Sequence, residues 1–175
     1  ELLAAVWAVT RESLVAGNVS KTNREAIATA VSKVNECPFC VDVHTTMLSG
    51  GARRDVIRGI LSGDLETIRD HKSRSIVEWT LATRTPDAPI LRNPPFTPDE
   101  APEIIGTAVL FHYINRIVNV FMYDGSPLRL PAGLGWLKGA FRRLAGGLIA
   151  GRVMRLQVHP GESLSLLPET STPPV

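Results

Sequence analysis

Apolar residues recur at helical spacing through most of this 175-residue chain. Near its start, Leu2, Val6 and Leu14 lie four and eight residues apart, on one helix face. Gly17 followed by Asn18 is a typical end for such a helix. No stretch of any length alternates apolar and polar residues, as a half-buried strand would. The spacing therefore predicts an all-α fold.

Local signals divide the chain into separate predicted helices. Thr22 with Glu25 three residues later forms a capping box, which predicts a helix running to Val34. Pro38 suits the first turn of the next helix, which we expect to end at Gly50. Five prolines make residues 85–98 a loop or linker. Further helices are expected over about 52–61, 65–83, 100–122 and 133–154.

Residues 100–122 are apolar nearly all round, which predicts a central buried helix. A buried helix must provide partners for its polar side chains, here His112, Asn115, Arg116 and Asn119. They could form an internal hydrogen-bond network, contact another subunit, or line a substrate pocket. The tryptophans are also expected in the core: Trp7, Trp79 and Trp136.

The length predicts one domain, residues 1–155, followed by a tail. The tail, residues 156–175, contains Pro and Ser and is expected to be extended, in a form that could lie along a neighbouring subunit. Within the domain, Glu25–Val31 matches Glu103–Val109 at five of seven positions. This match suggests two similar helical halves, although common helix formers can also match by chance.

The composition excludes several classes of protein. A net charge of +2 with mixed signs, and basic residues without interleaved aromatics late in the chain, predicts no nucleic-acid binding. No apolar run reaches the roughly 18 residues of a membrane span, and Arg11 and Glu12 do not suit a signal peptide. Two cysteines three residues apart cannot form a secreted disulfide framework. We expect a cytoplasmic protein.

The two cysteines define the candidate site. Residues 37–40 read Cys-Pro-Phe-Cys, and His44 follows one helical turn later. With Pro38 at the first helical position, Cys37 is the N-cap, and Cys40 and His44 follow on the same face. The positive end of the helix dipole favours the thiolate, which would lower the cysteine pKa from about 8.5 towards neutrality. Imidazole exchanges protons near neutral pH, and one thiol can capture a sulfenic acid on the other as a disulfide.

Other interpretations of these residues stay open. The cysteines could be an incidental pair, and Glu25 could be only the capping-box residue of its own helix. A zinc site would need a further ligand from His71, His112, His159 or a carboxylate, and no second paired motif provides one. We therefore predict no metal.

Glu25, Cys37, Cys40 and His44, spaced by 12, 3 and 4 residues, resemble the signature of the AhpD-like alkylhydroperoxidase branch of the carboxymuconolactone decarboxylase superfamily. The surrounding residues 35–44 are also typical of this branch. The resemblance implies an all-helical fold that assembles as trimers or larger rings. It implies that Cys40 attacks the peroxide and Cys37 resolves the product, with Glu25 and His44 as the proton relay. It also implies no bound cofactor, and a lipoyl-bearing partner that supplies dihydrolipoamide.

Phe39 departs from that pattern, because the best-known members have a histidine directly before the second cysteine. A phenyl ring carries no titratable proton and cannot act in a relay. The function expected is a thiol-dependent peroxidase, or dithiol oxidoreductase, that reduces organic hydroperoxides. The alternatives are a decarboxylase-type lyase or isomerase with His44 as its acid and base, and a non-catalytic redox sensor or zinc-binding protein.

Overall fold

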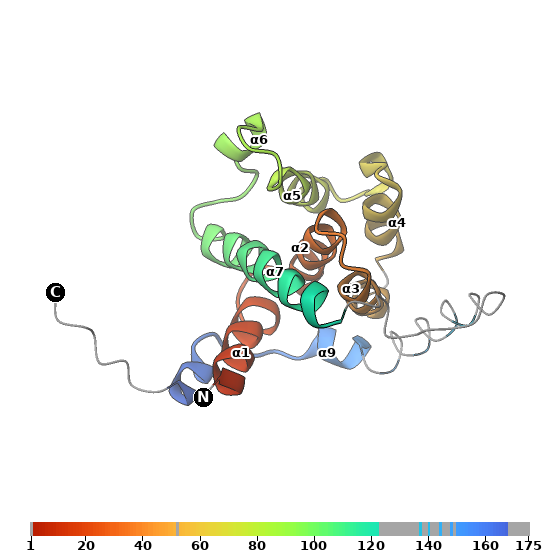
Figure 1. Cartoon of the computed structure of the whole chain (residues 1–175). Coiled ribbons are helices and arrows are strands. Elements are labelled where there is room, and N and C mark those ends of the chain that lie inside the picture. Colours follow the sequence, from red (N-terminus) through yellow and green to blue (C-terminus); the bar gives the residue numbers. More distant parts are fainter. Residues whose placement is uncertain are drawn as a thin grey trace.

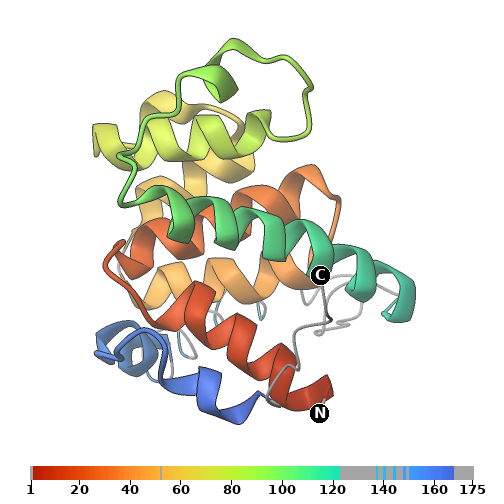
Figure 2. The same cartoon turned by 90° about the vertical axis from the view of Figure 1, so that its left-hand side faces the viewer.

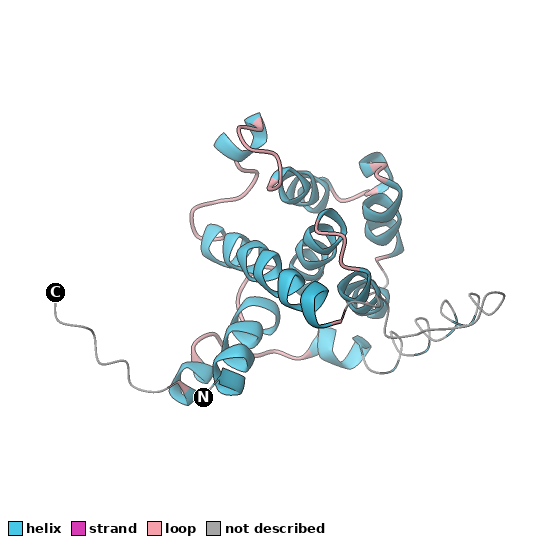
Figure 3. Cartoon of the chain, viewed as in Figure 1, coloured by secondary structure: helices cyan, strands magenta, loops and turns pink. Residues whose placement is uncertain are grey.

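The structure is a computed structural model that describes residues 2–51, 53–122 and 150–167, with isolated positions 137, 140, 144 and 148. Within these residues every regular element is a helix, which confirms the all-α prediction (Figure 3). The α-helices are α1 (Leu2–Thr10), α2 (Lys21–Val34), α3 (Pro38–Gly50), α4 (Arg54–Ser62), α5 (His71–Ala82), α6 (Pro89–Arg92), α7 (Ala101–Phe121) and α9 (Gly151–Arg155). Shorter helical turns are η1 (Arg11–Val15), η2 (Leu65–Thr67) and η4 (Glu162–Leu166).

The helices are arranged in three groups (Figures 1 and 2). α4, α5 and α6 lie at one end, α1, α9 and η4 lie at the other, and α2, α3 and α7 lie between them. α2 is the central element, because it packs against α3, α4, α5 and α7.

Small side chains allow α2 to be surrounded in this way. Ala26, Ala28 and Ala30 are fully buried and keep the neighbouring backbones close. Thr29 and Ser32 are also buried, and their hydroxyls donate to the carbonyl oxygens four residues earlier, at 2.8 and 2.6 Å. Their polar atoms are therefore satisfied inside the core.

Two apolar clusters lie on opposite sides of α2. One joins Ile27 and Val31 to Ile76 of α5 and Phe111 of α7. The other joins Ala26 and Ala30 to side chains of α3, α4 and α5: Leu48, Val56, Ile60 and Val77. Each fully buried branched side chain contributes about 1.5–3 kcal/mol. The hairpin of α2 and α3 is thus held from both sides.

The start of α2 differs from the prediction. Ser20 is the N-cap residue, and its hydroxyl accepts from the Asn23 N–H at 3.2 Å. The expected capping box of Thr22 and Glu25 is therefore wrong: Glu25 lies one turn inside the helix and is buried. This position releases its carboxylate for another partner.

The turn between α2 and α3 brings the ends of the two helices together. Glu36 adopts a left-handed conformation with φ of 52°, and the Cys37 N–H donates to the Ser32 carbonyl at 2.9 Å. α3 then starts with Cys37 as the N-cap residue and Pro38 in its first turn, as the sequence predicts. The short connection makes α2 and α3 antiparallel, so the start of α3 lies beside the end of α2.

α7 is not the central buried helix that its composition suggests. One face, containing Ile104, Ala108 and Phe111, is buried. The opposite face is exposed and apolar; it comprises Ile105, Val109, Tyr113, Ile117, Val120 and Phe121. The expectation that no run reaches the length of a membrane span is wrong for α7, which is long and apolar enough by length and composition alone. The core helix of a globular protein passes the same test, and a third of the most apolar window of α7 is buried.

Gly17 joins the N-terminal helices to α2 and lies against α7. Its φ of 112° favours glycine, and an added Cβ would lie 2.5 Å from the Glu103 Oε2 atom. The Glu103 carboxylate accepts from the N–H groups of Asn18 and Val19, each at 2.8 Å. It also lies 3.7 Å from the buried Arg24 guanidinium. Glu103 therefore fixes this turn against α7.

Several other expectations change in detail. The predicted helix over 65–83 is divided into η2 and α5, and the loop over 85–98 contains the short α6. Trp79 is buried as predicted, whereas Trp7 is exposed, and Trp136 lies outside the described residues. The predicted helix over 133–154 falls mostly outside them too; α9 belongs to its end.

The described part of the tail differs from an extended segment. Residues 162–166 form η4, which folds back on the N-terminal helices of the same chain. The Glu12 carboxylate accepts from the Gly161 N–H at 2.7 Å and from the Ser163 hydroxyl. These hydrogen bonds lower the pKa of Glu12 to about 2, and the bond from Ser163 has the largest effect.

Candidate functional site

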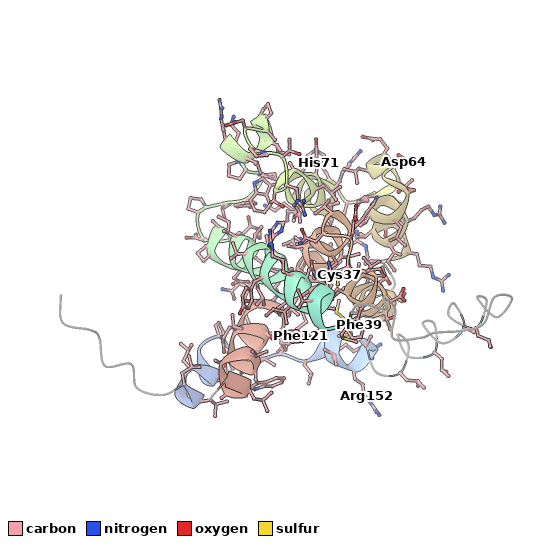
Figure 4. The ribbon with its side chains drawn as sticks, viewed as in Figure 1. Cys37, Phe39, Asp64, His71, Phe121 and Arg152 are labelled. Carbon is pink, nitrogen blue, oxygen red and sulfur yellow. The ribbon has the colours of Figure 1, made fainter. Side chains whose placement is uncertain are left out.

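The two thiols lie at the start of α3, beside the end of α2. Both are free thiols, and their residues are only 1% (Cys37) and 3% (Cys40) exposed. Cys37 precedes the helix as its N-cap residue, and Cys40 belongs to the first turn. Figure 4 shows Cys37 where α2, α3 and α7 meet. The dithiol is therefore enclosed by helices.

His44 and Glu25 form a hydrogen-bonded pair next to the thiols. The His44 Nδ1 atom lies 2.7 Å from Glu25 Oε2, and both residues are buried. Because an ionised carboxylate only accepts, the Nδ1 atom must carry the proton and donate it. The Nε2 atom of a neutral His44 is then a free base. Phe111 of α7 holds the ring in an edge contact, with centroids 4.6 Å apart.

Burial changes the expected chemistry of Cys40. Its pKa is raised to about 12, first by burial, then by the hydrogen bond and charge of Cys37. The helix dipole stabilises a thiolate at this end of α3, but the loss of hydration on burial outweighs the dipole. The expectation of a lowered pKa is therefore wrong for Cys40. In this conformation the thiol is protonated at neutral pH.

The structure brings all four predicted site residues together on the α2–α3 hairpin. Cys40 and His44 are one turn apart on the buried face of α3, and Glu25 faces that surface from α2. Among the described residues, the hydrogen bond of His44 goes to Glu25 and none joins it to a thiol. His44 and the thiols are thus neighbours without a hydrogen bond between them. Transfer of a proton from a thiol to His44 requires a further contact.

The polar residues of α7 form an internal hydrogen-bond network, which is one of the three arrangements predicted from the sequence. Asn115 is fully buried and accepts from Asn35 Nδ2 at 3.1 Å. His112 lies 3.1 Å from the same Asn35 nitrogen through Nδ1, and 2.8 Å from the Thr83 hydroxyl through Nε2. Burial, followed by Arg116 and Arg84, lowers the pKa of His112. His112 is therefore a neutral member of the network.

Sequence reasoning missed four members of this network: Ser32, Asn35, Thr83 and Arg84. Asn115 Nδ2 donates to the Ser32 hydroxyl at 3.1 Å, and Arg84 donates to Asn35 Oδ1 at 3.0 Å. A signal for Ser32 was present in the sequence, because it lies among the apolar residues of α2 and a buried hydroxyl needs a hydrogen-bond partner. Arg84 carried no signal, because it follows α5 and meets Asn35 only through the fold.

The described residues contain no cluster of three or more histidine, cysteine or acidic side chains that could hold a metal ion. Both ring nitrogens of His112, one of the possible zinc ligands, are within hydrogen-bond distance of Asn35 and Thr83. Phe39, which lies between the two cysteines in the sequence, is half-buried on α3 and offers no proton. The chemistry of this site therefore depends on the two thiols and the Glu25–His44 pair.

Comparison with known proteins gives two matches. The sequence model of the carboxymuconolactone decarboxylase family matches residues 1–81, which include all four site residues. A Mycobacterium tuberculosis protein named an alkyl hydroperoxide reductase is 39% identical over 172 residues. The match covers 98% of this chain and 47% of that protein, so the chain spans about half the length of its relative. No solved structure matches the chain.

Proposed function

We propose, from the match of residues 1–81 to the carboxymuconolactone decarboxylase family and from the site itself, that the chain is an enzyme that reduces organic hydroperoxides with the Cys37–Cys40 pair. The observation that supports this most is the arrangement of the site. Two free thiols at the start of one helix adjoin a buried Glu25–His44 pair on the same hairpin. The name of the M. tuberculosis relative agrees with this activity.

The first step oxidises Cys40. Its thiolate sulfur attacks the terminal, hydrogen-bearing oxygen of the hydroperoxide, the O–O bond breaks, and the leaving alkoxide takes a proton to become an alcohol. Cys40 becomes a sulfenic acid. The thiol of Cys37 then attacks that sulfur, which forms the disulfide and releases water.

The Glu25–His44 pair supplies the proton transfers. The raised pKa of Cys40 means that the thiolate must be generated when substrate is present, rather than stored. His44 Nε2 accepts the thiol proton and returns it to the alkoxide, while Glu25 orients the ring and stabilises the imidazolium. Phe39 takes no part in this relay. An external dithiol such as dihydrolipoamide, on a lipoyl-bearing partner, then reopens the disulfide, and no bound cofactor is needed.

The test is a stopped assay of hydroperoxide loss with dihydrolipoamide as reductant, using cumene hydroperoxide. Wild type should turn over repeatedly, whereas Cys40→Ser should show no thiol-dependent loss. Cys37→Ser should complete a single round, because the sulfenic acid forms but cannot be resolved within the chain. Full turnover by Cys40→Ser would contradict the assignment.

A second candidate is a lyase or isomerase reaction of the decarboxylase type, with His44 as acid and base. The protonated state of Cys40 beside a complete Glu25–His44 pair favours it. Alkylation of both thiols separates the two functions. The peroxidase would be inactivated, while a lyase would keep its activity. A redox sensor would form the disulfide without sustained peroxide consumption, and one bound zinc per chain would identify a zinc-binding protein.

We also propose that the chain assembles with copies of itself, as trimers or a multiple of them. The exposed apolar face of α7, including Val109 and Phe121, supports this, since such a surface is unfavourable in water. Residues 1–155 would form one domain in a cytoplasmic protein, with Glu25–Val31 and Glu103–Val109 as corresponding parts of two halves. Light scattering of wild type and Val109→Asp tests the assembly: the variant should have the smaller mass.

A further inference from the structure

Cys40 lies against polar side chains that the proposed mechanism leaves unused. The side chains of Asn115 of α7 and Ser32 of α2 adjoin its sulfur, and an N–H of Asn115 directed at the sulfur would lower the pKa of Cys40 against the effect of burial. Both side chains are fully buried. Whether Asn115 favours the thiol or the thiolate depends on which end of its amide faces the sulfur, because only the N–H end can donate.

The chain of hydrogen bonds behind Asn115 fixes that choice. Arg84 carries only donors, so the Asn35 atom that it meets at 3.0 Å must be the carbonyl oxygen. The Asn35 amide nitrogen then faces the other way. It donates to Asn115 Oδ1 at 3.1 Å, which leaves the Asn115 nitrogen facing Ser32 and the thiol.

The remaining partners agree with this direction. His112 is neutral and presents Nδ1 to the second N–H of Asn35, while its Nε2–H faces the Thr83 hydroxyl. The Thr83 hydroxyl donates onward to the Thr80 carbonyl at 2.6 Å. Ser32 donates its single hydroxyl hydrogen to the Ala28 carbonyl at 2.6 Å and so accepts from Asn115. One N–H of Asn115 remains for sulfur.

We propose that Arg84, acting through Asn35, holds Asn115 with an amide N–H directed at Cys40, and so stabilises the thiolate that attacks the peroxide. Asn115 would be the group that touches the reacting sulfur, and Arg84 and Asn35 would be positioning residues. The proposal rests on the proposed function in assigning the attack to Cys40. Each amide in the chain is polarised by the cation, which strengthens the last donor.

Removal of the cation should weaken this stabilisation in two ways. The amides of Asn35 and Asn115 lose the partner that fixes their direction, and a flipped Asn115 would turn its oxygen to the sulfur and favour the protonated thiol. Arg84 is exposed and follows the last turn of α5, so its replacement leaves the packed core intact. Arg84 is therefore the safest position to test.

The experiment measures the rate of Cys40 alkylation by iodoacetamide at pH 8, in full-length protein with the Cys37→Ser background throughout. Iodoacetamide reacts with the thiolate, so below the pKa the rate follows the thiolate fraction. Arg84→Met should slow the reaction about threefold and Arg84→Lys should restore it, since lysine still donates. Asn115→Leu should slow it about tenfold, the equivalent of one pKa unit. Arg92→Met, which removes an exposed arginine of α6, is the matched control and should change nothing.

The sign of the effect separates stabilisation of the thiolate from structural damage. A loosened core would expose the buried sulfur and speed alkylation, whereas loss of the donor slows it. An unchanged or faster rate in Arg84→Met, or a slow rate that Arg84→Lys does not restore, would overturn the proposal. The assay needs no peroxide, so a protein with the predicted rates but no peroxidase activity would refute the proposed function alone.

Discussion

α2 and α7 contain nearly the same seven residues, yet the structure uses them differently. In Glu25–Val31 all five shared residues are buried, because α2 is surrounded by other helices. In Glu103–Val109 the shared threonine and alanine are buried, whereas Ile105 is 43% and Val109 is 62% exposed. The same local sequence thus forms part of a core helix at residues 25–31 and part of a half-covered helix at residues 103–109.

The two glutamates show the same contrast in chemistry. Glu25 binds His44 inside the hairpin, whereas Glu103 accepts from the backbone N–H groups of Asn18 and Val19 and lies near Arg24. Sequence similarity therefore predicts a helix, but the neighbouring elements decide whether its carboxylate pairs with a histidine or supports a turn. Within the described residues, the candidate site lies on the α2–α3 side, with His44 and the thiols.

The largest expected effect separates the two glutamates by activity. Glu25→Gln should lower hydroperoxide turnover about 100-fold, because an amide cannot stabilise the imidazolium of His44. Glu103→Gln should keep turnover within about threefold of wild type at a temperature where it is folded. Steady-state assays of both variants measure this. Equal losses would show that Glu25 acts only through stability.

The next effect compares corresponding isoleucines. Ile27→Ala should lower the free energy of unfolding by about 3 kcal/mol, because it leaves a cavity in the core. Ile105→Ala removes a partly exposed side chain and should cost less than about 1 kcal/mol. Urea denaturation measures both. A similar loss at Ile105 in the concentrated protein alone would indicate that another copy covers α7.

A smaller effect concerns the structural glutamate. Glu103→Gln removes the charge beside buried Arg24 and weakens the acceptor for two backbone N–H groups. We expect a loss of about 1–2 kcal/mol in the free energy of unfolding. Thermal unfolding of this variant and Glu25→Gln provides the comparison. No change in Glu103→Gln would mean that solvent replaces these contacts.

The alkylation rate of Cys40, on the α2–α3 hairpin, should change gradually with pH. Because the pKa of Cys40 is about 12, its alkylation rate should rise about tenfold per pH unit from pH 7 to 10, without a plateau near pH 9. The folded state keeps a proton that the unfolded state loses above pH 9, so stability from this group falls as the pH rises from 9 towards 12. Rates in the Cys37→Ser background, which keeps the burial of Cys40 and removes the charge of Cys37, measure the first effect. A plateau below pH 9 would contradict the raised pKa.

The sequence could predict what depends on local spacing. Pro38 at the start of a helix and the one-turn step from Cys40 to His44 follow from helical geometry, and both are confirmed. The partner of Glu25 did not follow from capping rules, since Ser20 takes the N-cap position. The pKa of Cys40 could not be predicted because burial depends on α7 and α2 packing around the thiols. Arg84 was also beyond reach, since it lies 49 residues from Asn35 in the chain.

The most direct test is the reaction of reduced protein with one equivalent of cumene hydroperoxide, followed by intact-mass and peptide analysis. We predict that wild type consumes the hydroperoxide, releases the alcohol, and loses two hydrogens as a Cys37–Cys40 disulfide, while Cys37→Ser gains one oxygen on Cys40. Cys40→Ser should leave the hydroperoxide unchanged. Consumption by Cys40→Ser at the wild-type rate, or an unreacted wild-type dithiol, would contradict the central claim.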